Sequence, residues 1–364
     1  MKKIRKNFLV IFIALFVSFS CASDNANIIH GKITSISKYG NVTTDILKSY
    51  FEDNGFELGD LLYVKINNDI IVAPYGSGYP NVDTGKVIIL SSDGVYISVA
   101  INMGNFSNTY TATKNSDISF ALSKKHGYLD ELRVRSVESR RTNNRADYNT
   151  DEIFANFREV AVGNIKPNRL YRSSNPVNPE LGRNEFADRL IKDARIKTVM
   201  NLADSKEELE SYPSYNGSYY STLDVIPLDM GVDFKAVDFN EKLNRGLTFL
   251  SEHDSPYLVH CTEGKDRAGF VNALLECLGG ASFEEIVNDY MITYENYYGV
   301  QKESKEYSSI ANSNIYKMLI SITNSENIDD VKKVDLSLSA RNYLENTVGL
   351  SSDIVDTLYR KLCT

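Results

Sequence analysis

The stretch PYLVHCTEGKDRAGFVNALLECLGG, residues 256–280, predicts a strand, a loop and a helix in succession. Residues 257–259 form a short β-prone run, and apolar residues then recur at helical spacing over 270–278 until two glycines end the pattern. The loop between them, 262–267, contains a glycine and leads directly into the helix. Its backbone N–H groups can therefore turn inward and join the unpaired amides of the helix around an anion.

Cys261 and Arg267 flank this loop. The positive potential of the loop amides and the helix start would favour a thiolate at Cys261, which is the nucleophilic form of cysteine. Arg267 adds a planar fork that holds two oxygens of one phosphoryl group, a geometry that a lysine does not reproduce. A cysteine that only packs in a core would not be followed so closely by Glu, Lys, Asp and Arg. The pattern predicts a nucleophile that attacks phosphorus and an arginine that holds the phosphoryl group.

The segment HCTEGKDRAG, residues 260–269, resembles the signature loop of cysteine-dependent protein tyrosine phosphatases, and in particular their bacterial branch, whose loop reads Gly-Lys-Asp-Arg. Two upstream segments, DEIFANFREVAVGNIKPNRLYRSSNP (151–176) and IKTVMNLADSKEE (196–208), resemble the opening of the same branch. The likeness extends over residues 145–364. The spacing from cysteine to arginine alone would be a weak signal, but the strand, glycine, helix and upstream segments together make it strong.

The resemblance implies a tyrosine-phosphatase-like hydrolase of phosphoric monoesters that works through a phosphocysteine on Cys261, with Arg267 and without a metal or other cofactor. It also implies that the phosphate is bound by the loop residues Thr262, Glu263, Gly264, Lys265 and Ala268. Relatives usually carry Ser or Thr in place of Ala268, where a hydroxyl can hydrogen-bond the thiolate. We therefore expect a less stabilised thiolate and a slower breakdown of the phosphocysteine.

Three nearby side chains have roles that the sequence leaves open or only suggests. Lys265 either contacts a substrate phosphate or an anionic headgroup, or is a solvated loop lysine. Arg172 either lies near the pocket, as an arginine does in relatives, or forms an ion pair with Asp204. His260 is expected to orient the loop through hydrogen bonds.

The general acid has three candidates. Many tyrosine phosphatases carry it on a mobile Trp-Pro-Asp loop, but this chain has no tryptophan. In the Gly-Lys-Asp-Arg branch the loop aspartate itself is thought to serve, which corresponds to Asp266, although the adjacent Arg267 should oppose a proton there. Asp229 and Asp233, which follow a predicted strand, are the alternatives. We expect Asp266.

The resemblance favours a phosphotyrosine protein as the substrate and leaves room for a small phosphate ester. An inositol phosphate or phosphoinositide phosphatase with the same residues is the nearest alternative. A third possibility, from another class, is an inactive phosphate-binding module in which Ala268 signals lost turnover. The intact Cys261 and Arg267 count against that third possibility.

The first residues, MKKIRKNFLVIFIALFVSFSCAS, predict an export signal over 1–22. A basic start precedes an apolar run, 8–17, that is shorter than the roughly 20 residues of a membrane-spanning helix. Cys21 resembles the lipidated cysteine of a bacterial lipoprotein signal, although Ser18 stands where an aliphatic residue is usual. Cleavage after Ala22 is the alternative. We expect either a cell-envelope lipoprotein attached to the membrane through Cys21 or a secreted protein.

Charge and cysteine usage limit the partners. The formal net charge is −8, and loss of the four cations of the signal would make it −12, so no general attraction to nucleic acid or anionic lipid is expected. The four cysteines are too scattered for a disulfide framework or a zinc site.

Residues 27–124 consist of short runs rich in Val, Ile, Tyr and Thr between turn residues, which predicts a small β sheet or barrel. The region resembles the C-terminal β domain of S-adenosylmethionine hydroxide adenosyltransferases. The catalytic half of that family is absent, so we expect an accessory module for binding or spacing. Residues 125–144 are polar and charged, which predicts a linker; within it Arg141 either faces substrate phosphate or belongs to a solvated face.

Residues 145–364 alternate strand and helix patterns. Helical spacing near 184–194 precedes the strand KTVMNL, and a second strand, TLDVIPL, precedes helical spacing over 237–250. This order predicts an α/β domain with a mostly parallel central sheet, helices on both faces and the loop at the carboxyl end of a strand.

Overall fold

The N-terminal β region is an antiparallel sheet with the strand order β4-β3-β7-β1-β2-β6-β5. The structure is a computed structural model that describes residues 27–91 and 93–364; the predicted signal 1–22, with Cys21, lies outside the described residues. The strands are β1 (Ile28–Ile36), β2 (Val42–Leu47), β3 (Leu61–Ile66), β4 (Asp69–Pro74), β5 (Val87–Leu90), β6 (Tyr96–Ile101) and β7 (Asp117–Lys124), with short helices α1 (Lys48–Asp53) and α2 (Phe106–Thr109).

A parallel bridge between Tyr75 and Ile89 brings the two edge strands, β4 and β5, together, so the sheet is nearly a barrel. Buried and exposed residues alternate along β3, as a sheet with one face on a core requires. The core contains an aromatic cluster in which Phe51 packs against Phe56, Tyr75 and Phe120. The predicted β-rich fold of this region is confirmed.

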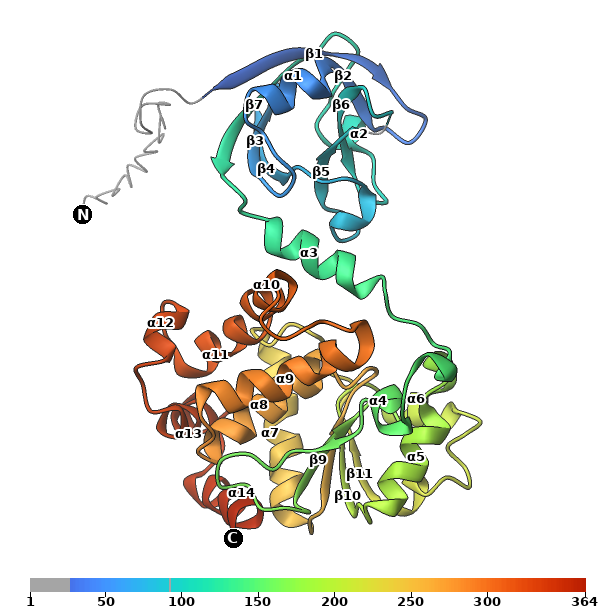
Figure 1. Cartoon of the computed structure of the whole chain (residues 1–364), viewed down its shortest axis with the longest axis vertical. Helices are drawn as coiled ribbons and strands as arrows, with labels where there is room; N and C mark the ends of the chain where they lie inside the picture. Colours follow the sequence, from blue (N-terminus) through green and yellow to red (C-terminus); the bar gives the residue numbers. More distant parts are fainter. Residues whose placement is uncertain (1–26, 92) are drawn as a thin grey trace, which may run out of the picture. The chain divides into compact units, whose positions relative to one another are not determined.

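The second unit, from Leu129 to Thr364, is built on a sheet with the order β11-β10-β12-β9-β8 (Figure 1). Its strands are β8 (Arg158–Glu159), β9 (Leu170–Ser173), β10 (Thr198–Asn201), β11 (Asp224–Pro227) and β12 (Tyr257–His260). All neighbours are parallel except β8, which is antiparallel to β9. The central strand β12 is fully buried, as expected for a parallel strand covered on both faces.

Helices cover both faces of this sheet (Figure 1). Adjacent residues of β12 point to opposite cores, Leu258 to one and Val259 to the other. On one side lie α5 (Asn184–Asp193) and α6 (Lys206–Ser211); on the other lie α7 (Val237–Glu252), α8 (Asp266–Leu278), α9 (Phe283–Tyr298), α11 (Ile315–Thr323), α13 (Leu336–Asn346) and α14 (Ser352–Cys363). The remaining helices are α3 (Leu129–Glu138), α4 (Asp151–Ala155), α10 (Lys305–Ser313) and α12 (Ile328–Val331). The predicted α/β architecture is confirmed.

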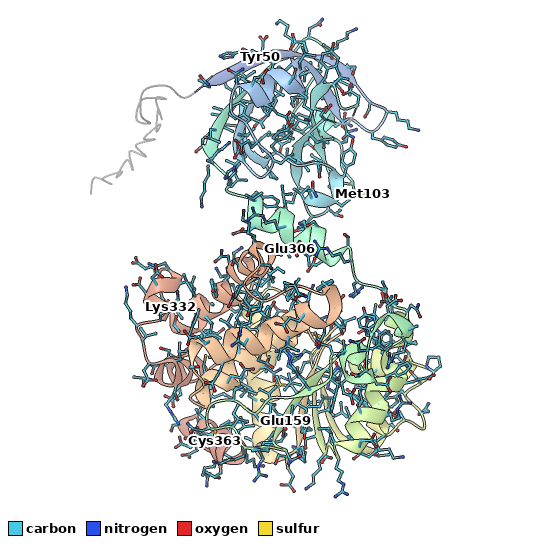
Figure 2. All side chains as sticks on the ribbon, viewed as in Figure 1. Tyr50, Met103, Glu159, Glu306, Lys332 and Cys363 are labelled. Carbon is cyan, nitrogen blue, oxygen red and sulfur yellow. The ribbon has the colours of Figure 1, made fainter. Side chains whose placement is uncertain are left out.

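The segment predicted as a linker, 125–144, contains helix α3, which belongs to the second unit and packs on α10. Val134 and Val137 are buried on one side of α3, and Arg133 Nη1 donates to Ser309 Oγ over 3.1 Å. Most of the charged side chains of this short helix are partly buried and have protein partners, so its charged pattern belongs to a packed helix and not to a solvated linker. Among the described residues, no helix has the length and apolar character to cross a membrane. Side chains of both units are drawn in Figure 2, where Cys363 marks the end of α14.

Candidate active site

The predicted loop lies between β12 and α8, at the carboxyl end of the central strand. Cys261 follows the last strand residue, is 3% exposed and is a free thiol. Helix α8 begins at Asp266, earlier than its apolar pattern suggests. Gly264 has a φ of +70°, and a Cβ there would lie 2.4 Å from the Ser173 carbonyl oxygen, so both its conformation and its surroundings require glycine.

The backbone of the loop is oriented by its carbonyl groups. Every carbonyl from Thr262 to Lys265 accepts a hydrogen bond from the protein. In that order the donors are the Asn175 N–H, the Tyr297 hydroxyl, the Arg172 guanidinium and the Gly269 N–H, at 2.8 to 3.2 Å. By contrast, the N–H groups of 262–267 donate to no protein group within the described part of the chain. Amides left free at a helix start next to a left-handed glycine form an anion-binding nest.

Arg267 folds back over the same loop. Its Nη2 donates to Thr262 Oγ1 over 3.0 Å, and its Nη1 donates to the carbonyl oxygens of Met230 (2.9 Å) and Leu202 (3.3 Å). Two carbonyls therefore fix one end of the guanidinium. Within the described residues the Nε–H makes no bond and Nη2 uses one of its two N–H groups, so each of these nitrogens keeps a donor for an oxygen of an anion.

Behind the loop lies a buried group of ions that we call the rear cluster: Arg158, Arg172 and Asp289. Arg172 Nη1 and Arg158 Nε lie 2.7 and 2.8 Å from the Asp289 carboxylate. Burial opposes the charge of Asp289, but the two guanidinium groups outweigh it and hold its pKa well below the usual range. The predicted alternative pairing of Arg172 with Asp204 is wrong, because Arg172 joins Asp289 to the Gly264 carbonyl.

Asp204 instead belongs to a polar network beside His260. Its carboxylate accepts bonds from Asn175, Asn201 and Tyr212 at 2.7 to 2.9 Å. His260 is buried, its Nε2 lies 2.8 Å from the Tyr220 hydroxyl, and burial lowers its pKa to about 4. The imidazole is therefore neutral at neutral pH. Its Nε2 faces Tyr220, which belongs to the core between the sheet and helices α5 and α6. This position fits the orienting role predicted for His260.

In front of the loop lies a second group of charges, the front cluster: Glu138, Arg141, Glu263, Lys265 and Asp266. Lys265 Nζ is 2.5 Å from Glu138 Oε1 and 3.7 Å from both Glu263 Oε2 and Asp266 Oδ2. Lys265 is 8% exposed, so the prediction of a solvated loop lysine is wrong. Arg141 forms an ion pair with Glu263, so part of the predicted linker reaches the loop.

Asp266 combines exposure with an unusual charge environment. Its side chain is 44% exposed, yet burial of the carboxyl by surrounding groups raises its pKa. Glu138 and Glu263 raise the pKa further, whereas Lys265 and Arg267 act in the opposite direction. The raised pKa shows that the opposing effect of Arg267 does not prevail. A carboxyl that keeps its proton more readily is suited to general acid work.

The two alternative acids lie on the segment after β11, which also supplies the Met230 carbonyl to Arg267. Asp229 and Asp233 are both exposed. Asp229 has a φ of +44°, and its carbonyl accepts a bond from Lys242. Asp233 Oδ1 accepts the N–H of Lys235 over 3.0 Å, so its carboxylate is engaged with its own turn. Asp266 alone of the three belongs to the loop.

Ala268 is fully buried in the same core as Cys261. The hydroxyl that relatives carry at this position is replaced by a methyl group that packs, in agreement with the sequence.

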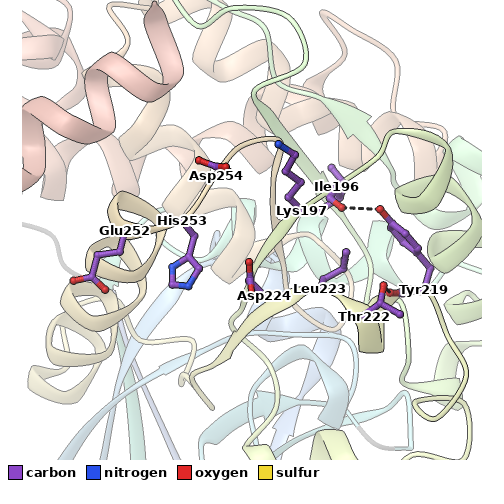
Figure 3. Close-up of a pocket in the computed structure, with 9 residues that line it drawn as sticks. All are labelled: Ile196, Lys197, Tyr219, Thr222, Leu223, Asp224, Glu252, His253 and Asp254. Carbon is purple, nitrogen blue, oxygen red and sulfur yellow. Dashed lines mark hydrogen bonds between the residues drawn. The ribbon is translucent and has the colours of Figure 1, made fainter.

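A surface pocket elsewhere in this unit contains none of the predicted site residues (Figure 3). It has a volume of about 500 Å³ and is lined by Ile196, Lys197, Tyr219, Thr222, Leu223, Asp224, Glu252, His253 and Asp254. These residues flank the starts of β10, β11 and β12, opposite the strand ends that carry the loop.

Sequence reasoning missed the contributions of Glu138, Asn156, Asp289 and Tyr297. Asn156 Nδ2 contacts the carbonyls of Glu263 and Gly264, each at 3.3 Å. Asn156 and Asp289 both lie within or near segments that resemble the phosphatase family, but nothing in their spacing points to the loop. For Glu138 a signal exists: the i, i+3 valines of 134 and 137 indicate a helix with one buried side.

Comparison with known families supports both resemblances. The family described as "Tyrosine phosphatase family" matches residues 152–364, and the "SAM hydroxide adenosyltransferase C-terminal domain" matches residues 31–119. The two resemblances predicted from the sequence are confirmed. The comparison with curated proteins finds no match.

Similar solved structures share little with the chain. An uncharacterized conserved protein from Thermotoga maritima is 20% identical with a TM-score of 0.25; the match covers 26% of this chain and 35% of that protein. A conserved hypothetical protein from Thermus thermophilus is 15% identical with a TM-score of 0.21, and the coverages are 25% and 34%. This chain therefore spans about a third of the length of each of those two proteins. The core catalytic domain of PP-IP phosphatase SIW14 from S. cerevisiae, in complex with citrate, is 20% identical with a TM-score of 0.29, and the coverages are 46% and 93%. These likenesses are too weak to bear on function.

Proposed function

Because the chain belongs to the tyrosine phosphatase family over residues 152–364, we propose that it hydrolyses phosphate monoesters through a phosphocysteine on Cys261. The enzyme class, a tyrosine-phosphatase-like hydrolase of phosphoric monoesters, follows from the family. The observation that carries the mechanism is the orientation of the loop: its carbonyls are held by the protein, and its N–H groups are left free beside a buried thiol.

In the first step the Cys261 thiolate attacks phosphorus, and the bond between phosphorus and the ester oxygen breaks. The phosphoryl oxygens lie on the N–H groups of 262–267 and at the start of α8, where the helix dipole favours negative charge. The Nε/Nη2 edge of Arg267 holds two of those oxygens. The departing oxygen takes a proton from Asp266, which leaves an alcohol or phenol and an Asp266 carboxylate.

In the second step water attacks the phosphocysteine, and the bond between sulfur and phosphorus breaks. The water proton passes to the Asp266 carboxylate, and inorganic phosphate and the Cys261 thiolate are released. With Ala268 in place of a hydroxyl, the departing sulfur has no side-chain donor from that position. We expect this second step to limit turnover.

Phosphotyrosine in proteins is the substrate class that we favour, and inositol phosphates or phosphoinositides are the alternative. The support is the resemblance of the loop together with the charge around it: the loop lysine is paired with carboxylates and does not present a free cation to a polyanion. We also propose export, as a lipoprotein through Cys21 or as a secreted chain, from the signal pattern of residues 1–22.

Steady-state kinetics on phosphotyrosine peptides, phosphoserine peptides, inositol phosphates and phosphoinositides test the proposal, with Cys261→Ser as the control. We expect turnover of phosphotyrosine that Cys261→Ser abolishes while phosphate binding remains. Acid quench of the active enzyme during turnover should trap a phosphorylated peptide containing Cys261. Substantial activity in Cys261→Ser, or a metal requirement that persists after desalting, would contradict the mechanism.

Export is tested separately, by mass spectrometry of the mature N-terminus and by membrane fractionation. Lipidation predicts a membrane-bound protein that Cys21→Ala releases. An unmodified N-terminus at Ser23 would indicate ordinary secretion instead.

A further inference from the structure

The ammonium group of Lys265 lies among acidic and aromatic side chains. Its ammonium group is closest to Glu138, at 2.5 Å, and two more carboxylates, those of Glu263 and Asp266, lie at 3.7 Å. The rings of Tyr294 and Tyr298 lie beneath the same nitrogen, with centroids at 5.7 and 5.9 Å. An ammonium group has three donors, and here anionic oxygens and aromatic faces surround it.

Glu138 comes from outside the part of the chain that matches the phosphatase family. It is the last residue of α3, whereas the family match begins at residue 152. Polar contacts that do not involve the loop hold α3 and the residues just after it: Lys317 Nζ lies 3.1 Å from Glu131 Oε1 of α3, and Arg140 Nη1, two residues beyond the helix, lies 3.0 Å from Glu306 Oε2. These contacts hold the end of α3 in place, so the carboxylate of Glu138 has a defined position beside Lys265.

The other cation of the front cluster is also engaged, because Arg141 pairs with Glu263. Two cations thus face three carboxyl groups, and the entrance to the loop carries no excess of positive charge. A second anionic group on a substrate would have to displace Glu138 from Lys265 and approach the carboxylate of Glu263 at the same time. Like charges brought this close repel each other.

We propose that Glu138 is a specificity-determining residue that occupies the place of a second substrate anion at Lys265, and so restricts the site to monophosphate esters. Esters with a further phosphate beside the scissile one are disfavoured. This inference rests on the proposed function and narrows its substrate class. It favours phosphotyrosine over inositol polyphosphates for a reason that the loop sequence alone does not contain.

The test compares two probes in the Cys261→Ser background: a phosphotyrosine peptide with uncharged neighbours and myo-inositol hexakisphosphate. Calorimetry gives the Kd of each probe with Glu138 intact and with Glu138→Gln. Because Glu138 is 35% exposed and solvent screens its charge, we take its pair with Lys265 as worth about 1 kcal/mol and expect Glu138→Gln to tighten hexakisphosphate binding about fivefold. Binding of the phosphotyrosine peptide should change less than about twofold.

Glu306→Gln is the matched control, because Glu306 and Glu138 have side chains that are both 35% exposed and both pair with a cation. Glu306 contacts Arg140 and not the loop, so its loss loosens α3 without freeing Lys265. Glu306→Gln should leave both Kd values unchanged. Glu138→Asp, which keeps the charge, should bind hexakisphosphate as weakly as the parent does.

Three results would overturn the inference: tighter hexakisphosphate binding than phosphotyrosine binding with Glu138 intact, equal changes of both Kd values in Glu138→Gln, or the same change in Glu306→Gln. Failure of the proposed function looks different. In that case the enzyme with Cys261 turns over neither probe, whatever the ratio of the Kd values. A parallel measurement of KM and kcat in the active enzyme should place the effect of Glu138→Gln on hexakisphosphate in KM.

Discussion

The loop that carries Cys261 has charged groups on two sides, and the two sets differ in burial. In the rear cluster the exposure of the side chains ranges from 1% for Arg172 to 11% for Arg158. In the front cluster exposure ranges from 10% for Lys265 to 44% for Asp266. Removing one partner of a buried pair leaves an uncompensated charge, which costs about 3 to 5 kcal/mol, whereas exposed pairs are worth about 0 to 1 kcal/mol. Burial therefore assigns the rear cluster to holding the loop and the front cluster to adjusting its chemistry.

A buried carboxyl next to the rear cluster fits this division. Glu276 on α8 is 1% exposed, and burial, with the charge of Asp289 added, raises its pKa well above the usual range. Arg172 and Arg158 act in the opposite direction but do not prevail. A neutral Glu276 leaves Asp289 as the anion that pairs with both arginines.

The largest effect is expected from Arg172→Leu, with Arg141→Leu as its counterpart in the front cluster. Loss of Arg172 leaves Asp289 with one cation and leaves the Gly264 carbonyl with only the 3.3 Å contact of Asn156, which should reduce the free energy of unfolding by about 3 to 5 kcal/mol and abolish activity. Loss of Arg141, whose side chain is 22% exposed, should reduce it by about 1 kcal/mol at most. Urea unfolding followed by the helical circular dichroism signal measures both. Equal losses would remove the distinction between the clusters.

The next effect concerns Asp266 and separates it from the other acids. Asp266→Asn should slow phosphotyrosine hydrolysis by about a hundredfold to ten-thousandfold, because the phenolic oxygen then leaves without a proton. An aryl phosphate with an acidic leaving group needs little protonation and should be slowed far less. The ratio of the two kcat/KM values is the measurement.

Asp229→Asn and Asp233→Asn are the controls for this ratio. If one of them is selective for phosphotyrosine while Asp266→Asn slows both substrates equally, the acid lies on the segment after β11. In that event the front cluster would support the conformation of the loop without taking part in proton transfer.

A pH profile sharpens the comparison further. Glu263→Gln removes an anion that raises the pKa of Asp266, so this pKa should fall. The substitution also releases Arg141 from its ion pair, and the positive charge of Arg141 should lower the pKa of Asp266 as well. Asp266 must be protonated to act as an acid, so a lower pKa means that activity is lost at lower pH. The basic limb of kcat/KM for phosphotyrosine, which reports the first step, should therefore move to lower pH, whereas Glu306→Gln should leave it in place. If the basic limb does not move, the charges of the front cluster do not control the pKa of Asp266.

The contiguous parts of the site could be predicted from the sequence. Strand β12, the glycine and helix α8 lie within one stretch of the chain, so local patterns contain the nest, Cys261 and Arg267. The same holds for the parallel sheet, whose strands and helices alternate in order along the chain.

The supports of the loop could not be predicted in the same way. Asp289 is 117 residues from Arg172, and Glu138 is 127 residues from Lys265, so only the folded chain brings these charges together. A sequence of ionic residues does not specify which of many possible partners each one meets, and the guess of Asp204 for Arg172 failed for that reason. Burial of Lys265 was hidden as well, because it depends on α3 and on the tyrosines of α9.

The smallest effect is expected at Ala268, a buried residue of the loop that belongs to neither cluster. Ala268→Ser would place a hydroxyl in the core that contains Cys261, where a donor could stabilise the departing thiolate in the second step. Hydrogen bonds to charged groups are worth about 1.5 to 3 kcal/mol, so turnover should rise by about tenfold to a hundredfold. The initial burst of product, which reports accumulation of the phosphocysteine, should shrink while the rate of the burst stays the same. A variant that loses stability and gains no turnover would show that the hydroxyl finds no partner there, and that the second step is not limited by the thiolate.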